Sequence, residues 1–203
     1  FTELICGYSI YFRAEDSMAY RLAIDHAHTN KVEWCARLGR TITAEDWPCE
    51  HLAKTYVTDR GPLRKWLGNQ LVNTLLIDIE NGPAYRPDLR GLVESLIGVI
   101  KKKDLKLDGA TPRPRTPGRR KKNRQPCLTP KELDQIIMNE IICHNKRVLA
   151  NRRLTKAMIR DLVPRVPIKL WAWGVRRLGG SLRKEDVNTL RLNLLPHAYG
   201  SIT

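Results

Sequence analysis

Two acidic residues with distinctive neighbours indicate where this chain could do chemistry. Asp59 ends the short apolar run at 56–58 and is followed by a Gly-Pro turn, and Glu94 lies 35 residues further along. Carboxylate oxygens are the ligands that Mg²⁺ prefers in proteins. Two Mg²⁺ ions about 4 Å apart, held by carboxylates, support phosphodiester chemistry. The fold must bring the two side chains together for this chemistry to occur.

The elements around these residues are predicted from their patterns. Residues 55–58 read as a strand that delivers Asp59, a helix is expected over 62–72, and residues 75–79 read as a buried strand. A helix over about 88–101 carries Glu94 away from its apolar stripe, beside Gly91 and Gly98. The carboxylate therefore has open space beside it. The alternative is an ordinary surface Glu exposed to solvent.

The sequences around Asp59 and Glu94 resemble those of a known family. Asp59-Arg60-Gly61, the spacing to Glu94, and the run from Tyr85 to Glu94 resemble the second Asp and the Glu of a DDE integrase core. The resemblance is strongest to transposases of the TnsB type, with retroviral integrases and Mu transposase as more distant relatives. The first catalytic Asp of that family would lie before Phe1, so the chain is expected to be a fragment, inactive by itself.

The resemblance implies an activity and its partners. Asp59 and Glu94 would be catalytic metal ligands for two Mg²⁺ ions, with Mn²⁺ as a possible substitute. Water would cleave a phosphodiester at a transposon end, and the freed 3′-hydroxyl would attack target DNA. The implied partners are transposon-end and target DNA, further copies of the same chain on that DNA, an AAA+ ATPase regulator and a second-strand endonuclease.

Charge points to the same class of partner. The chain has 203 residues and a net charge of +15, which favours nucleic acid as a partner. No segment approaches the ~20 apolar residues that span a bilayer, so no membrane partner is expected. Five scattered cysteines favour a reducing compartment, and the location implied by the family is the bacterial cytoplasm, on DNA. The Cys49-Glu50-His51 run has no second ligand pair at zinc spacing.

Candidate DNA-binding residues lie beside and beyond Glu94. Arginine matches phosphate geometry, and Arg86 and Arg90 could hold phosphates or form surface ion pairs with Asp88. Residues 101–126 contain eleven Lys or Arg against two Asp, interrupted by Pro and Gly. Such a run is either solvated or tracks DNA. The residues assigned to DNA there are Lys101, Lys102, Lys103, Arg113, Arg115, Arg119, Arg120, Lys121, Lys122 and Arg124.

The expected architecture is α/β. A partial RNase H-like (retroviral integrase) core at 1–100 is followed by a basic Pro/Gly linker at 101–127. A mainly helical segment at 128–196 then leads to the start of a C-terminal β-barrel at 197–203. Within these, we expect a strand over 4–12, a helix over 17–30 with exposed histidines, a loop over 36–50, and a helix capped by Thr129.

Two other functions remain open from the sequence. The chain could be a DNA-binding derivative without catalysis, which binds through its basic linker. It could also be an RNase H-like nuclease that hydrolyses without strand transfer. A strand-transfer assay separates the transposase from the nuclease, and a missing first Asp in the full-length protein would favour the non-catalytic derivative.

Overall fold

The computed structural model describes residues 2–12, 17–58, 73–81, 98, 128–150, 153–177, 179 and 182–196. The chain divides into two compact units. The first unit comprises 1–84 and 142–203, and the second comprises 85–141, of which only residue 98 and residues 128–141 are described. The described residues mix helices and strands, as an α/β chain requires.

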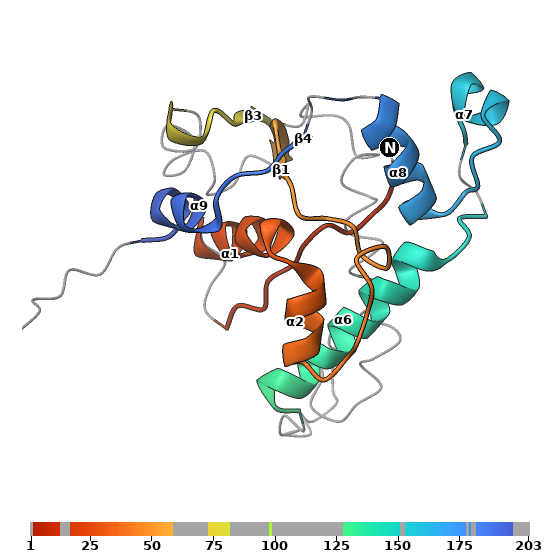
Figure 1. Ribbon diagram of the computed structural model, residues 1–203. Helices are drawn as coiled ribbons and strands as arrows, with labels where there is room; N and C mark the ends of the chain where they lie inside the picture. The colour runs from red at the N-terminus through yellow and green to blue at the C-terminus, as the bar shows by residue number, and fades with distance from the viewer. Residues whose placement is uncertain are drawn as a thin grey trace, which may run out of the picture. The chain divides into compact units, whose positions relative to one another are not determined.

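Figure 1 shows the elements in chain order. The helices are α1 (Ser17–His28), α2 (Lys31–Arg37), α6 (Pro130–Lys146), α7 (Lys156–Arg160), α8 (Pro167–Arg177) and α9 (Val187–Leu194). The strands are β1 (Leu52–Ala53), β2 (Thr55–Thr58), β3 (Asp78–Asn81) and β4 (Leu182–Arg183). No helix in the described ranges has the length and apolar character needed to cross a bilayer.

Two short strand pairs lie in the first unit. β2 and β3 are parallel, with Thr55 opposite Asp78 and Thr58 opposite Asn81. β1 and β4 are antiparallel, with Leu52 opposite Arg183. Parallel strands need a crossover of about a dozen residues or more, and the 19 residues between Thr58 and Asp78 meet that length. The predicted strand at 55–58 is confirmed.

The second predicted strand is displaced. Residues 75–79 were expected to form it, but the strand runs over 78–81. Leu75 and Ile77 are buried, whereas Leu76 between them is 69% exposed and has a φ of 47°. The apolar run therefore enters the core through a kink before the strand begins. The strand itself alternates exposed Asp78 and Glu80 with a half-buried Ile79.

One hydrophobic core gathers side chains from distant parts of the first unit. Helix α1 packs against α9 and β1, so the beginning and the end of the chain meet there. Tyr56 of β2 and Ile79 of β3 pack against this cluster and attach the parallel pair to it. The buried members are Ile24, Leu52, Leu75, Ile77, Leu190 and Leu194.

The predicted strand at 4–12 is wrong. Residues 2–12 form no strand, because their backbone groups bond to side chains instead of a neighbouring strand. The Ile5 N–H donates to Asn145 Oδ1 at 2.9 Å. The Ile5 carbonyl accepts from Trp47 Nε1 at 2.8 Å and from Asn145 Nδ2 at 3.1 Å. Side chains from two distant segments therefore hold this stretch in place.

Gly7 lets the same stretch lie directly against helix α1. A Cβ atom at position 7 would stand 2.6 Å from Ala27 N and 2.7 Å from Ala23 O. Both atoms belong to the α1 backbone, which cannot retreat as a flexible side chain can. Any larger residue at this position must push the stretch away from the helix.

The histidines of α1 were expected to be exposed, but both are buried. His26 is 5% exposed and lies among three aromatic rings, with centroid distances of 4.6 Å to Tyr8, 4.6 Å to Trp34 and 5.6 Å to Trp47. Its Nδ1 accepts a hydrogen bond from the Tyr8 N–H at 3.1 Å. That bond requires the neutral ring, with the proton on Nε2. Helical periodicity alone did not reveal this burial.

Acid is expected to destabilise the fold through His26. Burial first, and then the charges of Lys31 and Arg37, lower its pKa from 6.5 to about 3. Between pH 6.5 and 3, His26 is therefore protonated in the unfolded chain but neutral in the folded chain. The free energy of unfolding falls as the pH falls through this range. We expect a loss of about 2 kcal/mol between pH 7.5 and 5, measured by urea unfolding. His26→Gln cannot titrate and should show a smaller loss, and an equal loss in the variant would refute the assignment.

Helix α6 begins as the sequence predicts. The Thr129 N–H and hydroxyl donate to Glu132 Oε2 at 2.7 and 2.8 Å, and the Glu132 N–H donates back to the Thr129 hydroxyl at 3.3 Å. This reciprocal pair is a complete capping box. At the other end of α6, His144 Nε2 lies 2.9 Å from the Glu3 carbonyl and Asn145 holds Ile5. His144 is thus a structural contact of the first unit.

Helix α2 lies partly in the segment expected to be a loop. Asn30 caps it, accepting a hydrogen bond from the Glu33 N–H at 3.0 Å. An Asn followed by Glu three residues later is a recognisable start signal for a helix. The loop expected at 36–50 therefore begins only at Leu38, after the helix ends at Arg37.

Candidate functional site

The residues predicted to do chemistry lie outside the described part of the chain. This applies to Asp59 and Glu94, to Arg86 and Arg90, and to every basic linker residue assigned to DNA. Their roles stay predictions. The structure describes the strand that leads to Asp59, the strand beside it, and a basic helical segment further along the chain.

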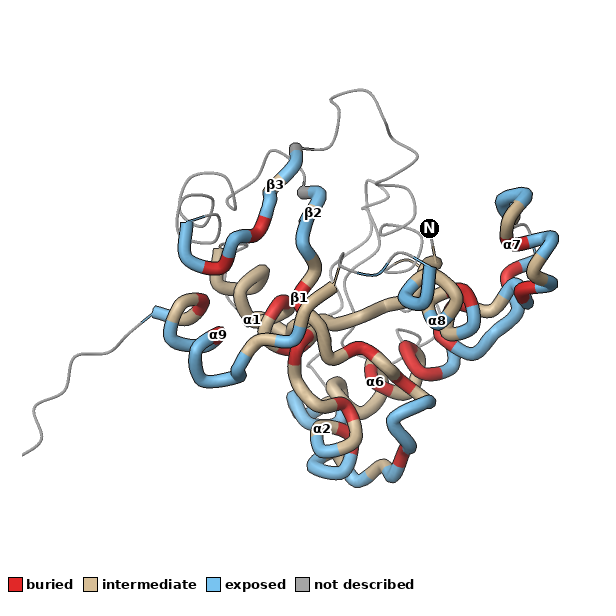
Figure 2. Tube along the Cα trace, turned by 45° about the horizontal axis from the view of Figure 1, so that its top comes forward, coloured by how far each residue is buried: buried red, intermediate tan, exposed pale blue. Residues whose placement is uncertain are grey.

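Strand β2 ends one residue before Asp59. Its partner β3 runs in the same direction, so the carboxyl ends of both strands lie at one edge of the pair. Tyr56 is turned toward the core, whereas Val57 is 56% exposed. Val57 lies opposite Glu80, which is also exposed. Figure 2 shows exposed, pale-blue stretches on both β2 and β3. The outer face of the pair is therefore open to solvent and carries acidic side chains on β3.

No metal site is formed within the described ranges. There, no group of three or more His, Cys, Asp or Glu side chains is placed to hold an ion. In the Cys49-Glu50-His51 run, a hydrogen bond with Cys6 and burial raise the pKa of the Cys49 thiol. Glu50 instead accepts a hydrogen bond from Asn30 Nδ2 at 2.6 Å. These residues serve packing and local hydrogen bonding.

Helices α7 and α8 form a small cluster of their own within the first unit. Thr155 caps α7 by accepting from the Met158 N–H at 3.2 Å. Pro167 opens α8, a position where its missing N–H costs no helical bond. The Leu149 N–H donates to the Arg165 carbonyl at 2.7 Å and ties the segment before α7 to the residues before α8. The buried side chains of the cluster are Leu149, Met158, Val163 and Leu170, with Leu154 and Trp173 packed against them.

Asp161 ties the turn after α7 to helix α8. Its carboxylate accepts from Trp173 Nε1 at 2.8 Å and from Arg160 Nε at 3.3 Å, and it also pairs with Arg177. The Arg177 guanidinium lies 5.6 Å from the centre of the Trp173 ring. Hydrogen bonds from Trp173, Arg177 and Arg160 lower the pKa of Asp161. Trp173 thereby anchors α8 to the turn after α7.

The segment that contains α7 and α8 is strongly basic, and the sequence prediction did not include it among the DNA-binding residues. Between Glu140 and Glu185 there are twelve Lys or Arg and a single acidic residue, Asp161. The count of basic residues alone carries this signal in the sequence. The described basic side chains on α7 and α8 are exposed: Lys156, Arg160, Lys169, Arg176 and Arg177.

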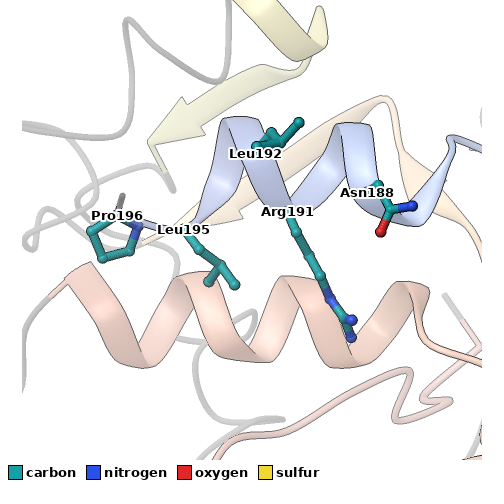
Figure 3. Close-up of a pocket in the computed structure, with 5 residues that line it drawn as sticks. All are labelled: Asn188, Arg191, Leu192, Leu195 and Pro196. Atoms are coloured by element: carbon teal, nitrogen blue, oxygen red, sulfur yellow. The ribbon is translucent and has the colours of Figure 1, made fainter. Parts of the chain in front are cut away.

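A hollow of about 320 Å³ lies on the surface of α9 and is lined by Asn188, Arg191, Leu192, Leu195 and Pro196 (Figure 3). Arg191 extends from α9 toward α1. Its guanidinium donates to both carboxylate oxygens of Asp25, at 2.9 and 3.3 Å. The charge of Arg191 is thereby neutralised, so the hollow offers no uncompensated cation to a ligand, and we assign it no function.

Comparison with known proteins identifies the family. The model of the family described as "TnsB C-terminal domain" matches residues 1–109. The chain is 28% identical over 215 aligned residues to the Transposon Tn7 transposition protein TnsB of Escherichia coli. The alignment covers 100% of this chain and 29% of that protein, so the chain spans less than a third of the relative's length.

The matched region contains both Asp59 and Glu94 and the parallel strands β2 and β3. It also covers more than half of the chain. The resemblance drawn from the Asp59 and Glu94 motifs is therefore confirmed at the level of the family, and the chain belongs to the TnsB C-terminal domain family.

Proposed function

We propose that this chain is part of a DDE transposase that cuts DNA at transposon ends and joins the freed ends to target DNA. The observation that carries the proposal is the family match over residues 1–109, which includes both acidic residues. The parallel pairing of β2 and β3 supports an RNase H-like core, because it places the segment that ends at Thr58 in a crossover-connected sheet.

Asp59 and Glu94 would hold two Mg²⁺ ions, or Mn²⁺ in their place. Carboxylates suit these hard cations, and Val57, two residues before Asp59 on β2, is exposed to solvent. When bound, the ions would supply activation of an attacking oxygen and stabilisation of the leaving oxygen. The two carboxylates would fix where that chemistry occurs.

The basic residues would hold the DNA. Arg86 and Arg90 can each present two parallel N–H donors to phosphate oxygens, which fixes the scissile strand in position. The linker residues from Lys101 to Arg124 would track the backbone by charge alone, without reading sequence. The remaining proposed features belong to the complete assembly. They are cleavage at a transposon end, target choice, further copies of the chain, and the ATPase and endonuclease partners.

A strand-transfer assay tests the proposal. Because the curated relative is longer than this chain, the assay uses a protein extended to the relative's full length. Labelled transposon-end DNA, a target plasmid and Mg²⁺ should yield joined products. Cleavage without joining would favour a nuclease that only hydrolyses, and DNA binding without cleavage would favour a non-catalytic derivative.

A further inference from the structure

We infer that helix α8 carries a second surface for duplex DNA, separate from the linker, formed by Lys169, Ala172 and Arg176. The inference rests on the proposed function, since it takes DNA to be the partner. Lys169, Ala172 and Arg176 are all exposed. At 100° per residue they lie within about 60° of one another around the helix, and the two cations stand about 10 Å apart along its axis.

Within the described ranges, neither cation has a counter-charge. Asp161 is the single acidic residue between Glu140 and Glu185, and its oxygens are taken by Trp173, Arg160 and Arg177. Among the described residues, no carboxylate forms an ion pair with Lys169 or Arg176. A polyanion that approaches this face would therefore replace water around the cations without having to break an existing ion pair.

Local helix electrostatics do not account for the arrangement. Basic residues are favourable in the last turn of a helix, which explains Arg176 and Arg177. Lys169 lies in the first turn of α8, where the helix dipole disfavours a positive charge, and that turn contains no acidic residue. An external anion would relieve this unfavourable placement.

The face is also shaped for close approach. Arg176 Nε donates to the carbonyl of Ala172 at 3.2 Å, which leaves the two terminal nitrogens of the guanidinium for a phosphate. Ala172 has only a methyl group, so no bulky side chain stands between the two cations. A spacing of about 10 Å approaches the ~12 Å width of the major groove, so both cations can reach phosphates of one duplex.

The neighbouring arginine provides a matched control. Arg177 lies on the same helix and carries the same charge, but its guanidinium is bound to Asp161 and stacked on Trp173. Removing it changes the net charge as much as removing Arg176 does. Arg37, exposed at the end of α2 and stacked on Trp34 at 5.0 Å, is a second control far along the chain.

The test measures binding of the 203-residue chain to a fluorescently labelled duplex between about 0.05 and 0.2 M KCl. Each lost phosphate contact should reduce the log–log salt slope by about 0.9. At about 0.1 M salt we expect Arg176→Gln to weaken binding roughly eight-fold, and Lys169→Gln with Arg176→Gln roughly fifty-fold. Arg177→Gln and Arg37→Gln should change it less than about two-fold. Circular dichroism confirms that each variant is folded.

The outcomes separate the two proposals. If the unmodified chain binds the duplex and the α8 variants behave like the two controls, the α8 surface is wrong and the transposase proposal stands. If the unmodified chain does not bind DNA at all, the proposed function itself fails, and the α8 surface fails with it.

Discussion

Replacing Asp59 by Asn, or Glu94 by Gln, is expected to lower DNA cleavage by a factor on the order of a thousand. Each change keeps the size of the side chain and removes its negative charge. A neutral amide offers one weak oxygen ligand where a carboxylate offers two strong ones, so the divalent ions would be lost or displaced. Loss of the metal centre removes several kcal/mol of transition-state stabilisation.

The measurement is a cleavage and strand-transfer assay on the extended protein, with DNA binding measured in parallel. Binding should be retained, because the basic residues that hold phosphates are unchanged in both variants. Asp78→Asn is the matched control, since it neutralises an exposed carboxylate on the neighbouring strand β3. Activity in Asp59→Asn or Glu94→Gln that equals the activity of this control would refute the ligand assignment.

Replacing Lys31 by Met is expected to destabilise the fold by about 3 kcal/mol. Lys31 is 1% exposed, and the three N–H donors of its ammonium are shared among four backbone carbonyls within hydrogen-bond distance. Two of these carbonyls lie in the last turn of α1, and their oxygens are 2.6 Å (His26) and 3.1 Å (Ala27) from Lys31 Nζ. The third belongs to Thr29, just after the helix, at 2.7 Å. The fourth, Cys49 at 2.8 Å, belongs to the loop before β1.

The reason for this large effect is that the last carbonyls of a helix have no partner within the helix. Lys31 donates to two of them, those of His26 and Ala27, and places a positive charge at the negative end of the α1 dipole. It also lies 5.6 Å from the centre of the Trp47 ring. Burial lowers the pKa of Lys31 to about 8, so the side chain still carries its proton at neutral pH. Methionine fills similar space but donates to none of these oxygens, although the His26 carbonyl keeps the Thr29 N–H as a donor at 3.2 Å.

Chemical denaturation of both variants and the unmodified chain measures this effect. Lys184→Met is the control, because its side chain is 69% exposed and lies 3.4 Å from Glu50 in a surface ion pair. Such pairs contribute between about 0 and 1 kcal/mol. Equal stability losses in the two lysine variants would show that the buried hydrogen bonds of Lys31 do not hold α1 to the loop.

Elements with local signals could be predicted from the sequence. The capping box of Thr129 and Glu132 fixed the start of α6, because its atoms belong to residues three apart. The β-branched and aromatic run at 55–58 fixed β2 in the same way. The family relationship was also accessible, since the motifs around Asp59 and Glu94 combine residue type with spacing.

Features that depend on distant partners could not be predicted. Residues 4–12 have the composition of a strand, but Asn145 and Trp47 take their backbone bonds. The burial of His26 depends on Tyr8, Trp34 and Trp47, which come from three other segments. A lysine is normally exposed, and nothing local marks Lys31 as buried. In each case tertiary contacts override the local pattern.

The most direct test of a shared metal centre is a double-mutant cycle on Mn²⁺ affinity, measured by electron paramagnetic resonance on the extended protein. The cycle compares the unmodified protein with Asp59→Asn, Glu94→Gln and the double variant. We predict that each single change weakens Mn²⁺ binding strongly and that the double variant is hardly weaker than either one, because both carboxylates hold the same ions. Strictly additive losses, or unchanged affinity in either single variant, would contradict the shared centre.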